Sequence, residues 1–508
     1  MGRSVLGWAC VFVLVALPVV GCSDESSGTR GTGGMGGAPD GSPNVVLILI
    51  DDLRPELESY GRLHVVSPNI DALAAEGLLF ENAYAQVPVC GASRASLFAG
   101  LRPTRTRFTR FDTRLCTDAP DVTSLPELFR DNGYMALSNG KVLHHVDDCV
   151  GHWSEPPWRA NGAGQGQKVY ALTENAQEFE ELGRSVAFEA ANVDDFAYPS
   201  GQVVEKSIAD LERLAGSGEP FFLAVGLWKP HLPFNAPTRY WDLYDPDLIP
   251  GPEPPDRATD APDVAFHDSP ELRNQYTGIP PAGEPIPPQL ARALRHGYLA
   301  SVSYVDALVG RLLDAVEEQG LDDNTIIVLV GDHGFLLGEQ TIWTKEVLFD
   351  ATLRVPLLIR APGFAKGART AAIAELLDLY PTLADLAGLP LPDPLDGASL
   401  RPVLEEPAAP GKGFAVSRFN TWFSLEPGLW FGESIRTDHW LYTEWPLDDG
   451  TLHGRMLYDH DVDSAETTNI AEIVDPAIVD ALSEELRAIT GTAAKDSGAT
   501  TFGREGSL

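Results

Sequence analysis

Continuous apolar runs alternate along this chain with segments whose apolar positions follow a helical period. The first run, NVVLILI from Asn44 to Ile50, is apolar and β-branched, as expected of a strand buried on both faces of a parallel sheet. It precedes SPNIDALAAEG, from Ser67 to Gly77, which has a serine cap, a proline in its first turn and a glycine at its end. These features predict a helix.

The same alternation recurs three times further along the chain. A helix predicted from Ser124 to Gly133 precedes the strand Tyr134–Ser138, an amphipathic segment from Val203 to Leu214 precedes the strand Phe221–Leu227, and a long helical pattern from about Gln289 to Gln319 precedes the strand Thr325–Val330. Repeated alternation of strand and helix predicts an α/β fold with a large, mostly parallel central sheet flanked by helices.

Three segments depart from this alternation. Residues 150–200 and 240–288 are rich in proline, glycine and acidic residues, and we interpret them as surface insertions around the sheet. After about Arg401 the runs become shorter and alternate, as in SIRTDHWLYT from Ser434 to Thr443. The sequence therefore predicts an α/β domain over residues 44–400 and a small C-terminal subdomain with an antiparallel sheet over residues 401–508.

The N-terminus has the pattern of an export signal. MGRS is followed by an apolar run of about 16 residues, from Val5 to Val20, which is short for a membrane-spanning helix. VVGC, ending at Cys22, resembles the bacterial lipoprotein box, in which the cysteine is lipidated and becomes the new N-terminus. Simple cleavage that leaves a free Cys22, or an uncleaved anchor, are the alternatives.

The following residues favour the lipoprotein interpretation. Residues 23–43, with GTGGMGG at their centre, are rich in glycine and serine and have the composition of a flexible tether. We therefore expect residues 1–22 to be a signal peptide and the exported protein to be held at a bacterial membrane, periplasmic or on the cell surface, by a lipid on Cys22.

Composition and charge limit the classes of function. The chain has 508 residues, of which 44% are hydrophobic and 22% charged, as is usual for a folded protein. Its 37 basic and 73 acidic residues give a formal net charge of −36. Such a field repels polyanions, so we expect no nucleic-acid partner. An anionic substrate would need a local basic pocket.

One of the five cysteines differs from the others. Cys10 lies in the signal, Cys22 at the lipoprotein box, and Cys116 with Cys149 could form a disulfide in an exported protein. Cys90 is then left over, in the stretch CGASR. From the residues alone it could be a packing residue, a metal ligand, half of a disulfide or a reacting group.

Acidic residues follow two of the predicted central strands. Asp51 and Asp52 come directly after the first strand, and Asp332 with His333 follow the strand at Thr325. A single such aspartate is most often a turn or a helix cap. Two clusters at the carboxyl ends of parallel strands could meet in one crevice, where a cation between the carboxylates would relieve their repulsion. Oxygen ligands of this kind suit Ca²⁺ or Mg²⁺.

Basic side chains form a second set near the predicted strand ends. An isolated lysine or histidine is usually solvated, but several at the rim of one sheet are better explained as a pocket for a small tetrahedral anion. His144 and His231 could then accept and donate protons, since imidazole titrates near neutral pH. The set comprises Arg94; Lys141, His144 and His145 in GKVLHH; Lys229 and His231 in WKPHLPF; and Lys345 in WTK.

These motifs, in this order, resemble the type I sulfatase family of the alkaline phosphatase superfamily, and are most similar to its iduronate-2-sulfatase-like branch. The resemblance covers roughly residues 44–475. It rests on NVVLILIDD, SPNIDALA, CGASR, GKVLH, KPHLPF, YLASVSYVD, GDHG, ELLDLYPTL and the segment from LYD at Leu457 to Asn469.

The resemblance implies a mechanism and a set of site residues. In this family the cysteine of the CGASR-type motif is converted by a maturation enzyme to formylglycine, whose hydrate is the nucleophile. Carried over, this makes Cys90 the nucleophile precursor, supported by Arg94. Asp51, Asp52, Asp332 and His333, with an oxygen of modified Cys90, match the Ca²⁺ ligands. The expected catalytic set is Cys90, Arg94, Lys141, His144, Lys229, His231 and Lys345.

The expected activity is hydrolysis of sulfate monoesters, on sulfated sugars or polysaccharides. A phosphodiesterase or phosphonate monoester hydrolase of the same superfamily is the alternative, and an inactive, acidic binding protein is a third. The chain departs from the family pattern at two positions. Ala92 stands where the motif usually has proline, and Gln340 stands where the iduronate-2-sulfatase pattern has histidine, so the sugar preference is not carried over.

Overall fold

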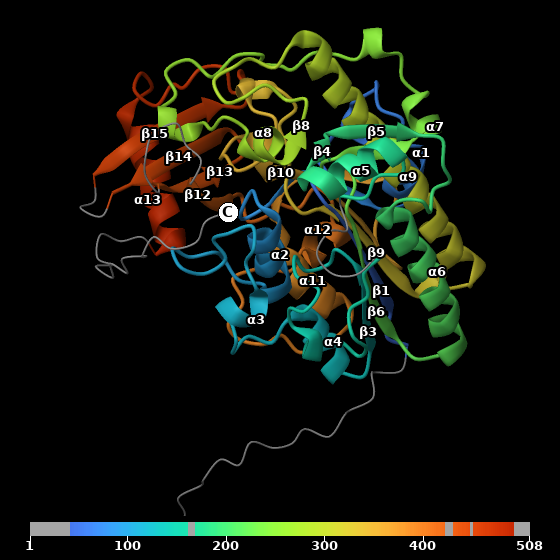
Figure 1. The fold of residues 1–508 in the computed structure, drawn as a ribbon. Helices are drawn as coiled ribbons and strands as arrows, with labels where there is room; N and C mark the ends of the chain where they lie inside the picture. Colours follow the sequence, from blue (N-terminus) through green and yellow to red (C-terminus); the bar gives the residue numbers. More distant parts are fainter. Residues whose placement is uncertain (1–40, 161–167, 422–429, 448–450, 492–508) are drawn as a thin grey trace, which may run out of the picture.

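A seven-stranded sheet runs through the middle of the molecule, with helices on both of its faces (Figure 1). The computed structural model describes residues 41–160, 168–421, 430–447 and 451–491. In spatial order the strands are β11 (Ala368–Glu375), β2 (Leu78–Tyr84), β10 (Arg354–Arg360), β9 (Thr325–Gly331), β1 (Asn44–Ile50), β6 (Phe221–Leu227) and β3 (Met135–Gly140).

The direction of the strands confirms the mostly parallel sheet. β1 pairs in parallel with both β6 and β9, β3 pairs in parallel with β6, and β11 pairs in parallel with β2. β10 is the exception, because it runs antiparallel to β2 and to β9. The sequence did not predict β2, β10 or β11, which extend the sheet on one side.

The continuous apolar run of β1 is explained by two cores. Val45, Leu47 and Leu49 belong to one hydrophobic cluster, and the intervening residues belong to the other. Since successive side chains of a strand point to opposite faces, a strand covered by helices on both sides has no polar face. The first cluster includes residues of α2 (Cys90–Ala99), α4 (Leu125–Asp131) and α11 (Leu379–Leu386), and the second includes residues of α1 (Pro68–Glu76), α6 (Pro199–Ser217) and α9 (Pro288–Glu318).

The four predicted helices are confirmed as α1, α4, α6 and α9, with bounds that differ by a few residues. α6 extends beyond its predicted limits at both ends. The interpretation of residues 150–200 and 240–288 as surface insertions is correct only in part. They also contain α5 (Thr173–Leu182), α7 (Thr238–Trp241), α8 (Pro270–Gln275), the short strands β4 (Ser185–Val186), β5 (Phe188–Ala191) and β8 (Tyr276–Thr277), and buried residues such as Val264, Phe266 and His267.

The predicted C-terminal antiparallel sheet is present. It comprises β12 (Ala415–Thr421), β13 (Trp430–Arg436), β14 (Trp440–Pro446) and β15 (Leu452–Asp459), in that spatial order. α13 (Pro476–Thr490) packs against it through Leu482 and Leu486, which join Ile435 and Tyr442 in a separate small core. A boundary between residues 400 and 401 stays a prediction.

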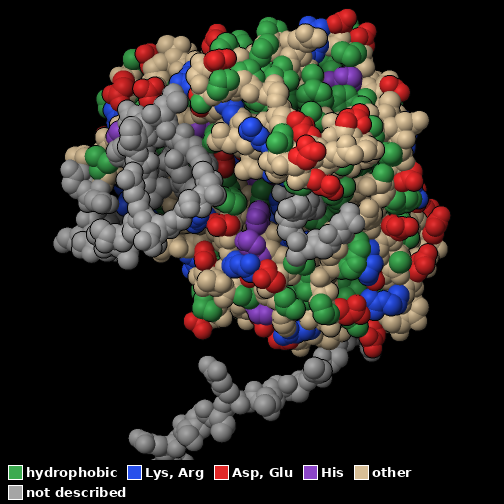
Figure 2. Space-filling view, in the orientation of Figure 1, with side chains coloured by type: hydrophobic (Ala, Val, Ile, Leu, Met, Phe, Trp, Pro, Cys, Tyr) green, Lys and Arg blue, Asp and Glu red, His purple; other side chains and the backbone are tan. Residues whose placement is uncertain are grey.

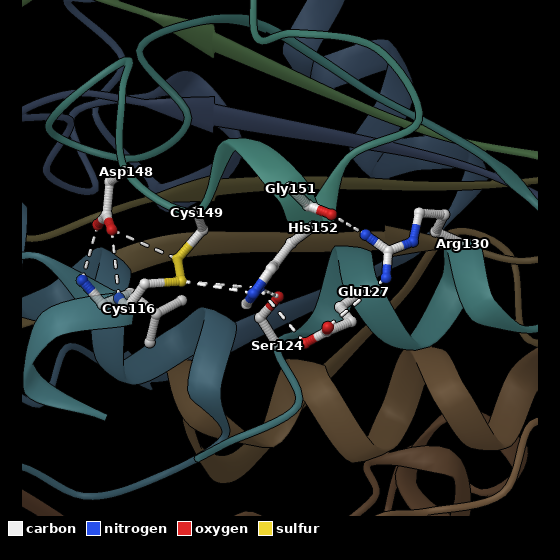
Figure 3. Close-up of a disulfide and its surroundings, with 9 residues drawn as sticks. Cys116, Ser124, Glu127, Arg130, Asp148, Cys149, Gly151 and His152 are labelled. Atoms are coloured by element: carbon white, nitrogen blue, oxygen red, sulfur yellow. Dashed lines mark hydrogen bonds and ion pairs between the residues drawn. A yellow bond between two sulfur atoms is a disulfide. The ribbon is translucent and has the colours of Figure 1, made fainter. Parts of the chain in front are cut away.

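A disulfide closes the loop that follows β3. Cys116, in α3 (Leu115–Asp118), is bonded to Cys149, 33 residues further along (Figure 3). Beside it, the Asp148 carboxylate accepts hydrogen bonds from the backbone N–H groups of Leu115 (2.7 Å) and Cys116 (3.2 Å). The possible pairing of these two cysteines is thereby confirmed, and the loop from Lys141 to Cys149 is fixed at both ends. Cys90 is the free cysteine of the described chain.

The predicted signal peptide, with Cys22, and nearly all of the tether lie outside the described residues. Within the described residues, no helix has the length and apolar character needed to cross a membrane.

Candidate active site

The two acidic clusters meet at one edge of the central sheet. β1 and β9 are parallel neighbours with Ile50 opposite Gly331, so the residues that follow each strand emerge side by side. The backbone N–H of Asp52 donates a hydrogen bond to the Asp332 carboxylate over 3.1 Å. Asp51, Asp52, Asp332 and His333 are all fully buried, which confirms that the predicted crevice brings them together.

Helix α2 begins at Cys90 and points its N-terminus into this crevice. The Cys90 sulfur lies 3.2 Å from His333 Nε2, and the residue is only 3% exposed. Gly91 permits this approach, since a Cβ there would lie 2.1 Å from the carbonyl oxygen of Phe111. A helix N-terminus favours negative charge nearby. The glycine of CGASR therefore lets α2 pack close to the neighbouring loop.

The ligand atoms of the cluster are close enough for one cation. One oxygen of Asp51 and of Asp332, the Cys90 sulfur and a ring nitrogen of His333 lie within 4.8 Å of one another. Burial, together with the neighbouring Asp51, raises the pKa of Asp52 to about 7, although Lys345 acts in the opposite direction. A buried carboxyl group whose pKa is raised by a neighbouring carboxylate is stabilised in its ionised form by a cation. The residues present thus fit a metal ion with mainly oxygen ligands.

Arg94 lies one turn along α2 and is completely buried. Its guanidinium donates from Nε to Asp332 over 2.8 Å and from a terminal nitrogen to Asp51 over 3.2 Å. It also donates to the backbone carbonyls of Lys141 and Val142. Because it joins both acidic clusters to the loop after β3, Arg94 offsets part of the negative charge and fixes the relative position of three segments.

Two lysines approach the carboxylates from different segments. Lys141 follows β3 and places Nζ 2.5 Å from Asp51, while Lys345 places Nζ 3.0 Å from both oxygens of Asp52. Burial alone would raise the pKa of Asp51, but Lys141, His231 and Arg94 hold it well below its ordinary value. Both lysines are nearly inaccessible to solvent. They therefore form a positively charged wall of the crevice.

The WKPHLPF segment after β6 places His231 near the acidic cluster, whereas its Lys229 side chain bonds to the backbone of the segment itself. His231 Nε2 lies 3.9 Å from Asp52, and Nδ1 lies 2.6 Å from the Leu232 carbonyl. The Lys229 ammonium instead donates to the carbonyls of His231 and Pro233, and burial lowers its pKa to about 7. Lys229 therefore stabilises the turn that contains His231.

His144 lies in the disulfide-closed loop, with its ring packed against Phe111 and His145. Burial and the nearby Lys141 lower its pKa to about 2. Within the described chain, its Nδ1 is buried and has no hydrogen-bond partner. His145 makes a different contact, with the Asp112 carbonyl at 3.0 Å. Figure 2 shows histidine side chains gathered near the middle of this face, where Figure 1 places α2.

One carboxylate of the site, that of Glu271, is not predicted by any sequence pattern. Glu271, in α8, lies 3.3 Å from His231 and 3.2 Å from Lys345. It belongs to the predicted surface insertion of residues 240–288, and no motif distinguishes it. Gln340 is also buried, with its side chain bonded to the backbone of Ala258 and Glu466.

Comparison with known proteins identifies the family to which the chain belongs. A family model described as Sulfatase matches residues 43–389. The chain belongs to the sulfatase family. A second model, for the C-terminal part of N-sulphoglucosamine sulphohydrolase, matches residues 338–491 of this sulfatase. The protein is therefore a hydrolase that acts on sulfate esters.

Individual relatives agree with this assignment. This sulfatase is 34% identical to iduronate 2-sulfatase of Mus musculus and 35% identical to that of Homo sapiens, with 84% of this chain and 90% of each relative covered. It is 30% identical to a sulfatase of Formosa agariphila, over 84% of this chain and 83% of that protein. These matches confirm the resemblance to the iduronate-2-sulfatase-like branch.

Solved structures confirm the alkaline phosphatase-like fold. A phosphonate monoester hydrolase of Agrobacterium radiobacter superimposes with a TM-score of 0.73 at 24% identity, covering 88% of this chain and 95% of that chain. A protein solved in complex with its substrate D-glucosamine-2-N,6-O-disulfate superimposes with a TM-score of 0.69 at 22% identity, covering 89% and 97%. At these identities the likeness concerns the fold.

Proposed function

We propose that this sulfatase cleaves sulfate monoesters of sugars or polysaccharides, with formylglycine made from Cys90 as the nucleophile and one Ca²⁺ in the acidic cluster. The observation that carries the proposal is the contact of the Cys90 sulfur with His333 inside a ring of buried carboxylates, walled by Lys141 and Lys345. A reacting group beside a metal site and two cations suits attack on an anionic ester.

The donors in the cluster fit Ca²⁺, which prefers carboxylate oxygens. Asp51, Asp52, Asp332 and His333 would hold the ion, together with an oxygen of the modified Cys90. When bound, the ion would act as a Lewis acid that neutralises charge on the sulfate oxygens. Formylglycine would supply a hydrated aldehyde as the nucleophile, and its second hydroxyl would provide the route by which sulfate leaves.

The protein's own side chains would bind the sulfate and move the protons. Lys141 and Lys345 would bind sulfate oxygens and orient the sulfur for in-line attack. Asp332 would take the proton of the attacking hydroxyl. As the bond between sulfur and the bridging oxygen breaks, its electron pair stays on that oxygen, and His231 would protonate it. His144, whose Nδ1 lacks a partner among the described residues, would take the proton of the second hydroxyl.

The first test compares paired aryl sulfate and aryl phosphate esters. We expect the purified protein to prefer the sulfate ester by more than about 10-fold in kcat/KM, because a phosphate monoester brings a second negative charge next to buried carboxylates. Steady-state kinetics on both esters measure the ratio. A dominant phosphoesterase activity would instead support the phosphodiesterase or phosphonate monoester hydrolase alternative.

We also propose that the protein is an exported bacterial lipoprotein, anchored through Cys22, and that a formylglycine-generating enzyme modifies Cys90. The sequence around Cys22 and the glycine-rich residues that follow support the anchor. Mass spectrometry of the membrane fraction is expected to find a diacylglyceryl group on an N-terminal Cys22. A soluble protein that begins at another residue would contradict the anchor and leave the sulfatase proposal untouched.

A further inference from the structure

Glu271 joins two basic side chains of the site that come from distant parts of the chain. One carboxylate oxygen lies 3.3 Å from His231 Nε2, and the other lies 3.2 Å from Lys345 Nζ. The side chain of Glu271 is 20% exposed, compared with 9% for His231 and 5% for Lys345. Glu271 therefore lies on the more exposed side of both side chains and links them through its two oxygens.

The insertion that carries Glu271 is tied directly to the segment of Lys345. His267 Nε2 lies 2.6 Å from the Lys345 carbonyl, and the backbone N–H of Trp343 donates to the Ser269 hydroxyl over 2.9 Å. The Ser269 N–H in turn donates to His267 Nδ1 over 2.9 Å. Since His267 accepts at Nδ1, it donates from Nε2 to the carbonyl. The start of α8 and Lys345 are thus held as one unit.

The orientation of the His231 ring also makes Glu271 its natural partner. Nδ1 faces the Leu232 carbonyl, so Nε2 is the nitrogen directed into the site. Asp52 contacts His231 and Lys345 as well, but it belongs to the expected metal ligands. Glu271 belongs to neither of the described groups that could hold an ion around Cys90. It can therefore hold His231 and Lys345 while the aspartates bind metal.

The ionisation state of Glu271 is consistent with contacts to both His231 and Lys345. Burial would raise the pKa of the Glu271 carboxyl, but Lys345 and His231 lower it to about 2. The group is thus ionised at neutral pH, so one oxygen can accept a hydrogen bond from Lys345, and the other can accept one from His231 Nε2 whenever that ring carries a second proton.

We propose that Glu271 is a positioning residue, which sets the spacing between the side chain that binds sulfate oxygens, Lys345, and the side chain that protonates the departing oxygen, His231. This inference rests on the proposed function, since it uses the roles assigned there. Glu271 acts through its two neighbours and does not touch the reacting atoms. A misplaced proton donor slows departure of an alcohol much more than departure of a phenol, because only the alcohol needs the proton.

The test measures how the loss depends on the leaving group. For Glu271→Gln, which keeps the size but offers one acceptor oxygen, we expect kcat to fall by roughly 10- to 100-fold with an alkyl or sugar sulfate and by less than about 3-fold with 4-nitrophenyl sulfate. Glu271→Asp, which restores the charge with a shorter side chain, should recover part of the loss. KM for 4-nitrophenyl sulfate should stay within about 2-fold of wild type.

Glu284→Gln is the matched control, since it removes the same charge from an exposed residue of the same insertion, and it should behave like wild type on both substrates. Equal losses of Glu271→Gln on both substrates, or no loss on either, would overturn the inference, with thermal unfolding confirming that each variant is folded. A wild-type protein inactive on both sulfate esters would instead refute the proposed function.

Discussion

The Cys90→Ala variant is expected to fold like the wild-type protein and to lose sulfatase activity by on the order of 10³-fold or more. The substitution removes a single buried sulfur atom from the start of α2, so we expect the free energy of unfolding to change by only about 1–2 kcal/mol. The same atom is the precursor of the proposed nucleophile, and the methyl group of alanine cannot replace it. Turnover of an aryl sulfate and chemical denaturation measure the two effects.

Ser96→Ala provides the control on the same helix. Ser96 is buried, and its hydroxyl donates to the Leu101 carbonyl over 2.6 Å, at a position further along α2 than Cys90 and Arg94. It should lose about 1 kcal/mol of stability and keep its activity. Peptide mass spectrometry should show formylglycine at position 90 in the wild type and in this control. Near-normal turnover by Cys90→Ala would refute the assignment of the nucleophile.

The second large effect is expected on stability, from Arg94→Ala. Arg94 is 0% exposed and pairs with Asp51 and Asp332, so its removal leaves two buried carboxylates without this cation. Breaking a buried ion pair in this way costs about 3–5 kcal/mol. Millimolar Ca²⁺ should restore part of the loss, since an ion bound to the native state alone stabilises it. Denaturation with Ca²⁺ and with a chelator measures both.

Arg110→Ala removes the same charge from the surface, where Arg110 pairs with Asp112 and both side chains are largely exposed. Its stability should change by less than about 1 kcal/mol. If Arg94→Ala were as stable as this control, the buried ion pairs of Arg94 would contribute little to the free energy of unfolding, which would contradict the prediction. If Ca²⁺ and chelator gave equal stability for every variant, the acidic cluster would not be a calcium site.

The sequence predicted the parts of the fold that have a strong local pattern. β1 and β9 are continuous apolar runs, and the acidic residues that follow them are correctly expected to meet because parallel neighbours end at the same edge. β10 has a similar apolar run, but the direction of a strand depends on the path of the connection before it, which no periodicity records. The antiparallel pairing of β10 therefore could not be predicted from the pattern of apolar residues.

The site was predictable to the extent that its residues follow strands. Lys141 and Asp332 come directly after β3 and β9, and their position follows from the sheet. Glu271 comes from an insertion whose path is fixed by contacts with residues more than 70 positions away, such as the bond between His267 and Lys345. The Lys229 ammonium bonds to backbone carbonyls because the local turn brings them within reach. Neither contact has a signature in the sequence.

The burial of Cys90 bears on the order in which the chain is modified and folded. Once α2 is packed, only 3% of this residue is accessible to solvent. If an enzyme converts Cys90 to formylglycine, as proposed, it needs an accessible stretch of chain, so we expect the conversion to precede folding. A molecule that folds first would be stable but permanently inactive. The specific activity of a preparation would then depend on the rate of Cys90 conversion relative to the rate of folding during biosynthesis.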